Sequence, residues 1–282
     1  SWALLKIYRE FNMKCISKKE INELNGRTKY SIQFIRENDL LGKKILNIGC
    51  GFGWFENEII QHNIDSIVGI EPLEEDLQNA KENISHTSIS FVAGSAIKIP
   101  FPSNYFDTVT CWEVLEHIPK NCEKIFFNEI KRVLTNKSDS RFYLSTPNNS
   151  FFSNILDPAY YFGHRHYSYS LLKIFADDAG FLIEKIRIKG GWYEVLSWWN
   201  HYVAKHVFKR DSFMKKQQSI IVDSEWQKKN GFTNIFPTIF CVVSIVLCLF
   251  CLSKAMNIIP VGFTYATYGG LTITAVTILG IF

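Results

Sequence analysis

Charged side chains are almost absent from the last part of this 282-residue chain. Between residues 231 and 282 the only one is Lys254, whereas charges are frequent up to about Asn230. Lys, Arg, Asp and Glu dominate water-exposed surfaces, so a long segment without them indicates an apolar environment. The uneven composition therefore predicts two parts, one in water and one in an apolar medium.

Cysteine pairs with the spacing of a zinc site are also missing. Seven cysteines, an odd number, stand at positions 15, 50, 111, 122, 241, 248 and 251. The last two form a C-x-x-C, but they lie in an apolar run, where small packing residues are the simpler interpretation. We therefore expect a reduced protein that faces the cytosol.

The chain lacks the strong positive charge of a nucleic-acid-binding protein, because its formal net charge is only +4. Part of the positive excess precedes the apolar tail, at Lys205, Lys209, Arg210, Lys215, Lys216, Lys228 and Lys229. Basic residues beside an apolar span are typical of the cytoplasmic side of a membrane. No nucleic-acid partner is predicted.

A secretory signal peptide is missing too, and since the chain starts at Ser1 we expect an incomplete N-terminus.

Internal repeats are absent, and residues 41–190 instead alternate between two patterns. Short apolar runs predict strands at 43–51, 66–72, 89–96, 105–114, 141–148 and 182–190. Amphipathic stretches predict helices at 54–63, 73–83, 121–134 and 168–181. This alternation predicts an α/β domain with a doubly wound, mostly parallel sheet covered by helices on both faces.

Two further segments flank this domain in water. Residues 1–40 are predicted to be a helical N-terminal segment. Residues 191–230 are predicted to be an amphipathic, basic connector, with aromatic and apolar residues at helical spacing. Such a helix either packs on the flank of the sheet or lies on a membrane or over a lipid-like substrate.

The tail, residues 231–282, is predicted to contain two transmembrane helices. Its runs 235–252 and 255–282 are uncharged and long enough to cross most of a hydrocarbon core. A buried soluble hairpin of helices is the alternative. With Lys228 and Lys229 on the inner side, the α/β domain would face the cytoplasm.

Glycines occupy every second position in the stretch GCGFG, directly behind the apolar run of the first predicted strand. A strand that ends in glycines before a helix brings backbone N–H groups to the carboxyl edge of a sheet, where ligands bind. The dinucleotide fingerprint G-x-G-x-x-G would need glycine at position 54, where Trp54 stands. A nicotinamide dinucleotide is therefore disfavoured.

The spacing Gly49-x-Gly51-x-Gly53 resembles the first motif of the class I S-adenosylmethionine-dependent methyltransferases, which have a Rossmann-like, seven-stranded fold. The resemblance continues to about residue 190. VGIEP resembles the second-strand motif, AGSAIKIPFPSNYFDTV the adenine-side segment, and CWEVLEHI the motif after the fourth strand, in the ubiquinone-biosynthesis subgroup. It implies S-adenosylmethionine as cofactor, with Glu71 accepting both ribose hydroxyls. The implied cofactor-binding residues are Asn47, Gly49, Cys50, Gly51, Gly53, Glu71, Pro72, Ser95, Ala96, Trp112 and Glu113.

Two of these residues depart from the pattern of the family. Asn47 stands where the family usually carries an acid, and Ser95 stands where an aspartate often reads the adenine amino group. We therefore expect weaker polar support of the loop or of the methionine ammonium group, and adenine contacts that rest on the backbone.

Methyl transfer from a sulfonium mainly needs the acceptor held in line, and a base has only to take the acceptor's proton. His117, just past the fourth strand, is the first candidate, with a purely structural histidine as the alternative. His166 or Tyr167 in GHRHYS can position or deprotonate a hydroxyl, unless this segment is only a loop held by ordinary hydrogen bonds. The ubiquinone-type resemblance also allows a divalent metal at Glu113, Glu116 and His117. Because these three ligands are crowded on one turn and no second cluster of ligands is present, we do not expect a bound metal ion.

The tail has a resemblance of its own, to the second and third helices of the small multidrug resistance transporters. The matching residues are Gly231, Phe232, Thr233, Pro237, Ile259, Pro260, Gly262, Tyr265 and Ala266. That family couples proton and drug through a glutamate in its first helix, and no intramembrane acid precedes Gly231. We therefore do not expect transport by this chain alone.

Taken together, these patterns predict a membrane-tethered methyltransferase that uses S-adenosylmethionine from the cytosolic face. Its expected acceptor is an oxygen of a small or lipid-linked molecule, such as a glycolipid, a polysaccharide precursor or a quinone. One alternative is a transporter-type membrane protein with a regulatory methyltransferase-fold domain, and another is a chimaeric or truncated reading frame. The sequence identifies neither the acceptor nor the oligomeric state.

Overall fold

The computed structural model describes residues 24, 26–157, 160, 163–191, 194, 195, 222, 223 and 226. The chain divides into two compact units, residues 1–24 with 31–186 and residues 25–30 with 187–282. In the second unit, the Tyr30 ring lies 5.6 Å from the ring of Trp226. The first unit contains residues 41–186 of the α/β domain predicted at 41–190, and residues 187–190 fall in the second unit. Most of the predicted N-terminal segment and connector lies outside the described residues.

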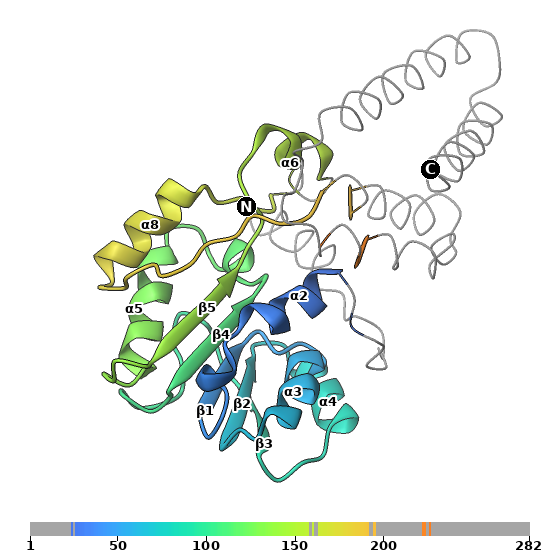
Figure 1. Cartoon of the computed structure of the whole chain (residues 1–282), viewed down its shortest axis with the longest axis vertical. Coiled ribbons are helices and arrows are strands. Elements are labelled where there is room, and N and C mark those ends of the chain that lie inside the picture. The colour runs from blue at the N-terminus through green and yellow to red at the C-terminus, as the bar shows by residue number, and fades with distance from the viewer. Residues whose placement is uncertain are drawn as a thin grey trace, which may run out of the picture. The chain divides into compact units, whose positions relative to one another are not determined.

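Five parallel strands form the sheet, in the order β3-β2-β1-β4-β5 (Figure 1). Their bounds are β1 (Lys44–Ile48), β2 (Ser66–Glu71), β3 (Ile89–Ala93), β4 (Thr108–Trp112) and β5 (Arg141–Ser145). Because β2 and β4 both pair with β1, the winding direction reverses there. This topology confirms the predicted doubly wound parallel sheet, and in such sheets ligands bind at the carboxyl ends of the strands where the order reverses, here β1 and β4.

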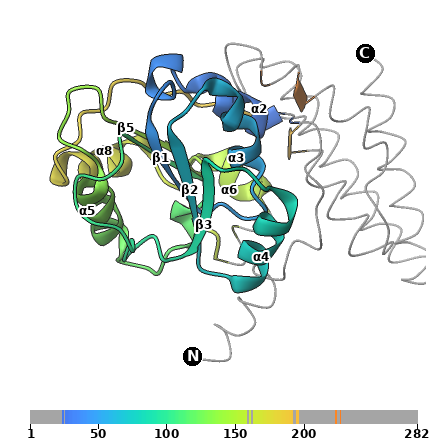
Figure 2. The same cartoon turned by 90° about the horizontal axis from the view of Figure 1, so that it is seen from below.

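Helices cover both faces of the sheet, as predicted. The helices among the described residues are α2 (Gly26–Phe34), α3 (Trp54–Ile59), α4 (Glu74–Asn83), α5 (Glu123–Val133), α6 (Phe151–Leu156) and α8 (Tyr169–Asp178). Short 3-10 turns are η1 (Glu37–Asp39), η2 (Ile60–His62) and η3 (Leu115–His117). Figure 2 shows α5 and α8 on one side of the strands and α3 and α4 on the other.

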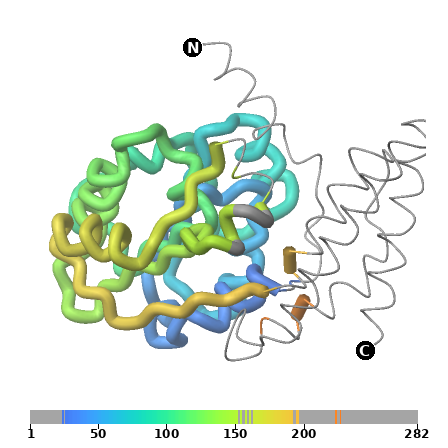
Figure 3. Tube along the Cα trace, turned by 90° about the horizontal axis from the view of Figure 1, so that it is seen from above, coloured from blue at the N-terminus to red at the C-terminus, as the bar shows by residue number. Residues whose placement is uncertain are grey.

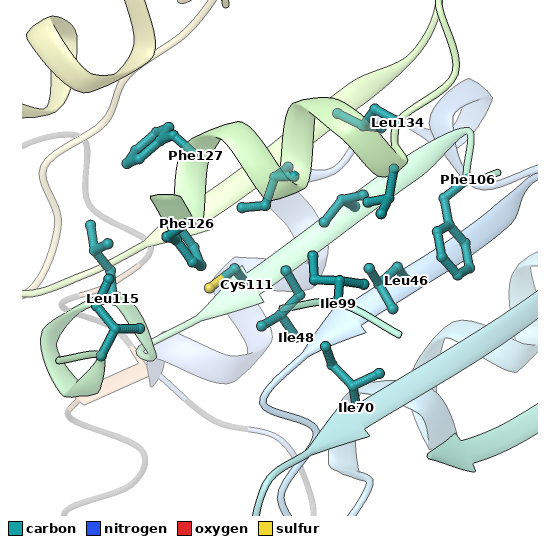
Figure 4. Close-up of a cluster of buried hydrophobic side chains, with 14 of the residues drawn as sticks. Leu46, Ile48, Ile70, Ile99, Phe106, Cys111, Leu115, Phe126, Phe127 and Leu134 are labelled. Atoms are coloured by element: carbon teal, nitrogen blue, oxygen red, sulfur yellow. The ribbon is translucent and has the colours of Figure 1, made fainter. Parts of the chain in front are cut away.

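Alternating side chains of each strand divide the core into two layers. Leu46 and Ile48 of β1 point toward α5 and pack with Phe126 (Figure 4). Ile45, the residue before Leu46, points to the opposite face and packs with Phe55 of α3. Each such side chain, fully buried, contributes roughly 1.5–3 kcal/mol to folding. This two-sided burial explains why the strands are almost uninterrupted apolar runs.

The strand predicted at 182–190 is not formed. This segment leaves α8 as an extended chain with no strand pairing (Figure 3). Leu182 is 92% exposed and Ile188 is 56% exposed. Alternation favours a strand only where a neighbouring strand is present to pair with it. The described part of the sheet therefore has five strands, not the seven that the resemblance implied.

No helix in the part of the chain that the structure describes is long and apolar enough to cross a bilayer. The two membrane helices predicted in residues 231–282 lie outside that part.

Candidate cofactor and acceptor site

The loop after β1 has the left-handed backbone that its glycines predict. Gly49 and Gly51 have φ values of +75° and +52°. A Cβ atom on Gly49 would overlap the side chain of Val114, so only glycine fits there. A Cβ atom on Gly51 would meet nothing within 4 Å. Gly51 therefore borders open space, where a ligand can come close to the backbone.

The carboxylate of Glu71 closes this loop from the end of β2. Its Oε2 accepts a hydrogen bond from the Gly51 N–H at 3.2 Å, and its Oε1 accepts one from the Leu73 N–H at 3.4 Å. Burial raises the pKa of Glu71, and the two backbone hydrogen bonds oppose this shift. The carboxylate is therefore fixed beside the loop, where the resemblance implies ribose binding. Pro72, the next residue, is exposed.

The remaining predicted cofactor residues follow β3 and β4 at the same edge of the sheet. Ser95 is exposed, and its Oγ accepts a hydrogen bond from the Ile97 N–H at 3.4 Å; Ala96 lies between them. Trp112 is buried, with its ring 5.7 Å from Phe55. Glu113 directly follows β4. Its Oε1 accepts a hydrogen bond at 2.6 Å from the hydroxyl of Ser145, the last residue of β5.

Asn47 connects β1, the strand before the glycine loop, to α3 and β4. Its Nδ2 donates to Glu56 Oε1 at 2.8 Å, and its Oδ1 accepts from Thr110 Oγ1 at 3.0 Å. Glu56 is fully buried, its Oε2 has no hydrogen-bond partner, and burial raises its pKa to about 7. Burial also raises the pKa of the Cys50 thiol, so Cys50 is a neutral packing residue. Sequence reasoning missed Glu56, although it shares the apolar side of α3 with Ile59.

His117 lies at the end of η3, against His164, with ring centroids 4.8 Å apart. Burial lowers the pKa of His117 to about 4, and the neighbours His164 and Arg165 lower it further while Glu113 opposes the shift. More than a third of its surface is nevertheless exposed, and solvent weakens the shift. The ring is thus neutral at pH 7 and able to accept a proton.

Arg165 fastens the GHRHYS segment to η3. Its guanidinium donates to the Leu115 carbonyl at 3.1 Å and also to the Ile118 carbonyl, and it forms an ion pair with Glu123. Tyr167 is 3% exposed, and its hydroxyl donates to Glu123 Oε1 at 3.1 Å. Burial raises the pKa of Tyr167 well above its ordinary value. The GHRHYS segment, residues 163–168, forms a wall of the site, and both side chains hold this wall in place.

His166 is buried in the same wall, among polar groups from α6 and the residue after it. Its Nδ1 lies 2.8 Å from Asn154 Oδ1, and its Nε2 lies 2.9 Å from Asp157 Oδ2. His164 lies alongside, with Nδ1 3.5 Å from the same Asp157 oxygen and Nε2 3.9 Å from Glu116 Oε1. The connection that carries these residues stands beyond the carboxyl ends of β4 and β5 (Figure 1).

Two sets of possible metal ligands share His164. Glu116, His117 and His164 form one set, and Asp157, His164 and His166 form the other; in each, the ligand atoms lie within 4.8 Å of one another. The sequence indicated only ligands on the turn after β4. Asp157 gave no sequence signal, because it lies in an irregular connection without a periodic pattern.

Comparison with known proteins identifies two regions. The family model described as a methyltransferase domain matches residues 46–140, and the one described as the Small Multidrug Resistance protein matches residues 218–282. Sterol 24-C-methyltransferase from Aspergillus fumigatus is 35% identical over 98 residues, which cover 33% of this chain and 25% of that protein. Ubiquinone biosynthesis O-methyltransferase from Neisseria meningitidis is 28% identical over 85 residues, covering 29% of this chain and 36% of that protein.

The tail has a relative as well. Quaternary ammonium compound-resistance protein QacH from Staphylococcus saprophyticus is 34% identical over 64 residues, covering 22% of this chain and 60% of QacH. The chain thus spans less than two thirds of each of these three relatives.

A solved complex supports the fold assignment. A chain in the complex of the Haloferax volcanii Trm112 methyltransferase activator with a methyltransferase matches with a TM-score of 0.50 and 19% identity. The match covers 57% of this chain and 71% of that one, and it shows the fold alone. The open space beside Gly51 and the fixed carboxylate of Glu71 fit S-adenosylmethionine at the end of such a sheet. Residues 46–140 are therefore a methyltransferase domain whose cofactor is S-adenosylmethionine, and residues 218–282 belong to a Small Multidrug Resistance domain.

Proposed function

We propose that this chain is a membrane-tethered methyltransferase that acts from the cytoplasmic side on an oxygen of a small or lipid-linked acceptor. The observation that carries the proposal is the cradle formed by the loop at Gly51 and the carboxylate of Glu71. S-adenosylmethionine supplies an activated methyl group when it is bound there. The protein then has mainly to orient the acceptor and receive its proton.

The chain's own residues divide these tasks between two sides of the site. Gly51 and Glu71 hold the ribose side of the cofactor, with Ser95 and Ala96 beside the adenine. Asn47 joins the strand before the loop to Glu56, in the helix after it. On the acceptor side, the neutral imidazole of His117 would take the proton of the acceptor hydroxyl.

His166 and Tyr167 contribute by fixing the wall beside His117. Both are buried and hydrogen-bonded within the wall, so their effect is to position other groups. A neutral base suits a hydroxyl acceptor, and the O-methyltransferase named among the relatives supports oxygen, whereas the sterol C-methyltransferase acts on carbon by its name. The Small Multidrug Resistance match at 218–282 supports the membrane tether.

Cofactor binding is tested by calorimetry of the full chain with S-adenosylhomocysteine. We expect binding by the wild type and an affinity at least ~10-fold lower in Gly51→Val, because the new side chain fills the ligand space. Gly42→Asn is the matched control, since Gly42 also has a positive φ, +64°, and open space around it, in the turn before β1. No measurable heat from the wild type contradicts the proposal.

Acceptor class and tether are tested with labelled S-adenosylmethionine on extracted membrane lipids and on soluble metabolites. Labelling of lipid by the full chain supports the proposal, and labelling of soluble metabolites alone contradicts its lipid-linked form. Deletion of 231–282 should release the protein from membranes. Unchanged membrane association and activity after deletion would show that the tail is not a functional tether.

A transporter-type protein with a regulatory methyltransferase domain is the second candidate, supported by the similarity of the tail to QacH. Efflux of a quaternary ammonium dye from vesicles containing the full chain would favour it. Methyl transfer without efflux favours the enzyme.

A further inference from the structure

We propose that Asp157, His164 and His166 bind a transition-metal dication, Zn²⁺ foremost, at a site separate from the cofactor cradle. Asp157 Oδ2 lies 3.5 Å from His164 Nδ1 and 2.9 Å from His166 Nε2. Zinc binds such atoms at about 2.0–2.2 Å in tetrahedral geometry, which places neighbouring ligand atoms about 3.3 Å apart. The observed separations lie on either side of this value. Small side-chain shifts therefore suffice to bring an ion among them.

The hydrogen bonding of His164 points independently to a ligand. Its side chain is only 9% exposed, and its buried Nδ1 has no hydrogen-bond partner. Buried polar atoms without a partner are rare in folded proteins. Nδ1 is the atom directed at Asp157, so a cation between the two would provide the missing interaction.

The environment of His166 supports the same position. Asn154 Oδ1 lies 2.8 Å and Ser153 Oγ 3.3 Å from His166 Nδ1; because the amide oxygen can only accept, the contact with Asn154 is a hydrogen bond when Nδ1 carries the hydrogen. In the neutral ring the lone pair of Nε2 then faces the carboxylate of Asp157 at 2.9 Å. Two acceptors at this distance require a proton or a metal ion between them.

Groups that orient metal-binding histidines are also present. A ligating histidine usually donates its second N–H to a carboxylate or carbonyl, which fixes the ring and makes it a better ligand. Asn154 Oδ1 fills this role for His166. Glu116 Oε1, 3.9 Å from His164 Nε2, is placed to do so for His164 when the ring moves toward it.

Two imidazoles and one carboxylate select the class of ion. Mg²⁺ and Ca²⁺ prefer oxygen ligands only, whereas nitrogen ligands favour zinc and its neighbours. Three protein ligands leave one position for water, and the partly exposed Asp157 gives access from solvent. Because the site joins the end of α6 to the segment beside His117, a bound ion would brace the acceptor wall.

The test is zinc titration of the full chain after chelator treatment, with S-adenosylhomocysteine binding as the control for folding. We expect one zinc per chain in the wild type and at least ~100-fold weaker binding in His166→Ala and Asp157→Ala. Asn154→Ala should bind ~10–100-fold more weakly. His166→Cys, which restores a ligand, should bind zinc again, and bound Co²⁺ should show the visible absorption of a tetrahedral site.

His117→Ala is the matched control, because His117 belongs only to the other set of ligands. It should keep wild-type zinc affinity. Zinc binding that survives in His166→Ala but is lost in His117→Ala would assign the ion to Glu116, His117 and His164 and overturn the proposal. Absence of zinc binding by the wild type at micromolar concentration would overturn it as well, leaving His166 and Asp157 as an ion pair.

Discussion

Replacing Glu56 by glutamine should make the protein more stable at neutral and alkaline pH. The carboxyl group of Glu56 is fully buried, one of its oxygens lacks a partner, and burial raises its pKa from an ordinary value of 4.5 to about 7. Between these values the folded chain binds the proton and the unfolded chain releases it. The contribution of Glu56 to stability therefore falls as pH rises from 4.5 to 7 and is constant above that range.

The size of the effect follows from the same two pKa values. A difference of about 2.5 between the folded and unfolded pKa corresponds to about 3 kcal/mol of unfolding free energy above pH 7, of which about 2 kcal/mol is lost between pH 5 and pH 7. Glutamine keeps the oxygen that accepts from Asn47 and carries no charge. Glu56→Gln should thus be more stable than wild type by about 2–3 kcal/mol at pH 8 and equally stable at pH 4.

Urea denaturation of the full chain at a series of pH values measures this directly. Glu58→Gln is the control, because Glu58 lies on the same helix and is not buried. Its profile should follow that of the wild type. If the Glu56→Gln profile also runs parallel to that of the wild type, the buried carboxyl group does not control stability and the reasoning fails.

Two further predictions concern the ion pair that holds the wall of the site and the proposed general base, His117. Arg165→Met should destabilise the fold by about 2–4 kcal/mol in urea denaturation, because it removes the cation that pairs with the mostly buried carboxylate of Glu123. Lys124→Met, which breaks an exposed pair with Asp178, should change stability by less than ~1 kcal/mol, and equal effects of the two variants would refute the argument. His117→Gln should lower the rate of methyl transfer about 100-fold while affinity for S-adenosylhomocysteine stays unchanged, and an unaltered rate would rule out His117 as the base.

Much of the cofactor side could be predicted from the sequence because it depends on local signals. Each strand of a βαβ unit ends at the same edge of the sheet, so residues just after a strand must gather there. The glycine spacing fixed the first turn, and Glu71 followed from its place at the end of the next strand. These positions need no knowledge of long-range packing.

Other features depend on contacts that no local pattern carries. Glu56 has the neighbours of any amphipathic helix, and only the packed structure shows that Asn47 is its partner. Asp157 and His164 come together through an irregular connection. The segment 182–190 has the alternation of a strand, yet pairing depends on a neighbouring strand that the described sheet does not supply.

The separation of the site into two sides has a consequence for how such a protein can change. In the proposed function, the methyl donor is recognised by turns at the ends of four strands, where any shift would disturb the sheet. The acceptor wall comes largely from one stretch of chain between β5 and α8, pinned by Arg165 to η3. Exchange of that stretch can therefore alter which molecule is methylated while the machinery for the methyl donor is inherited unchanged.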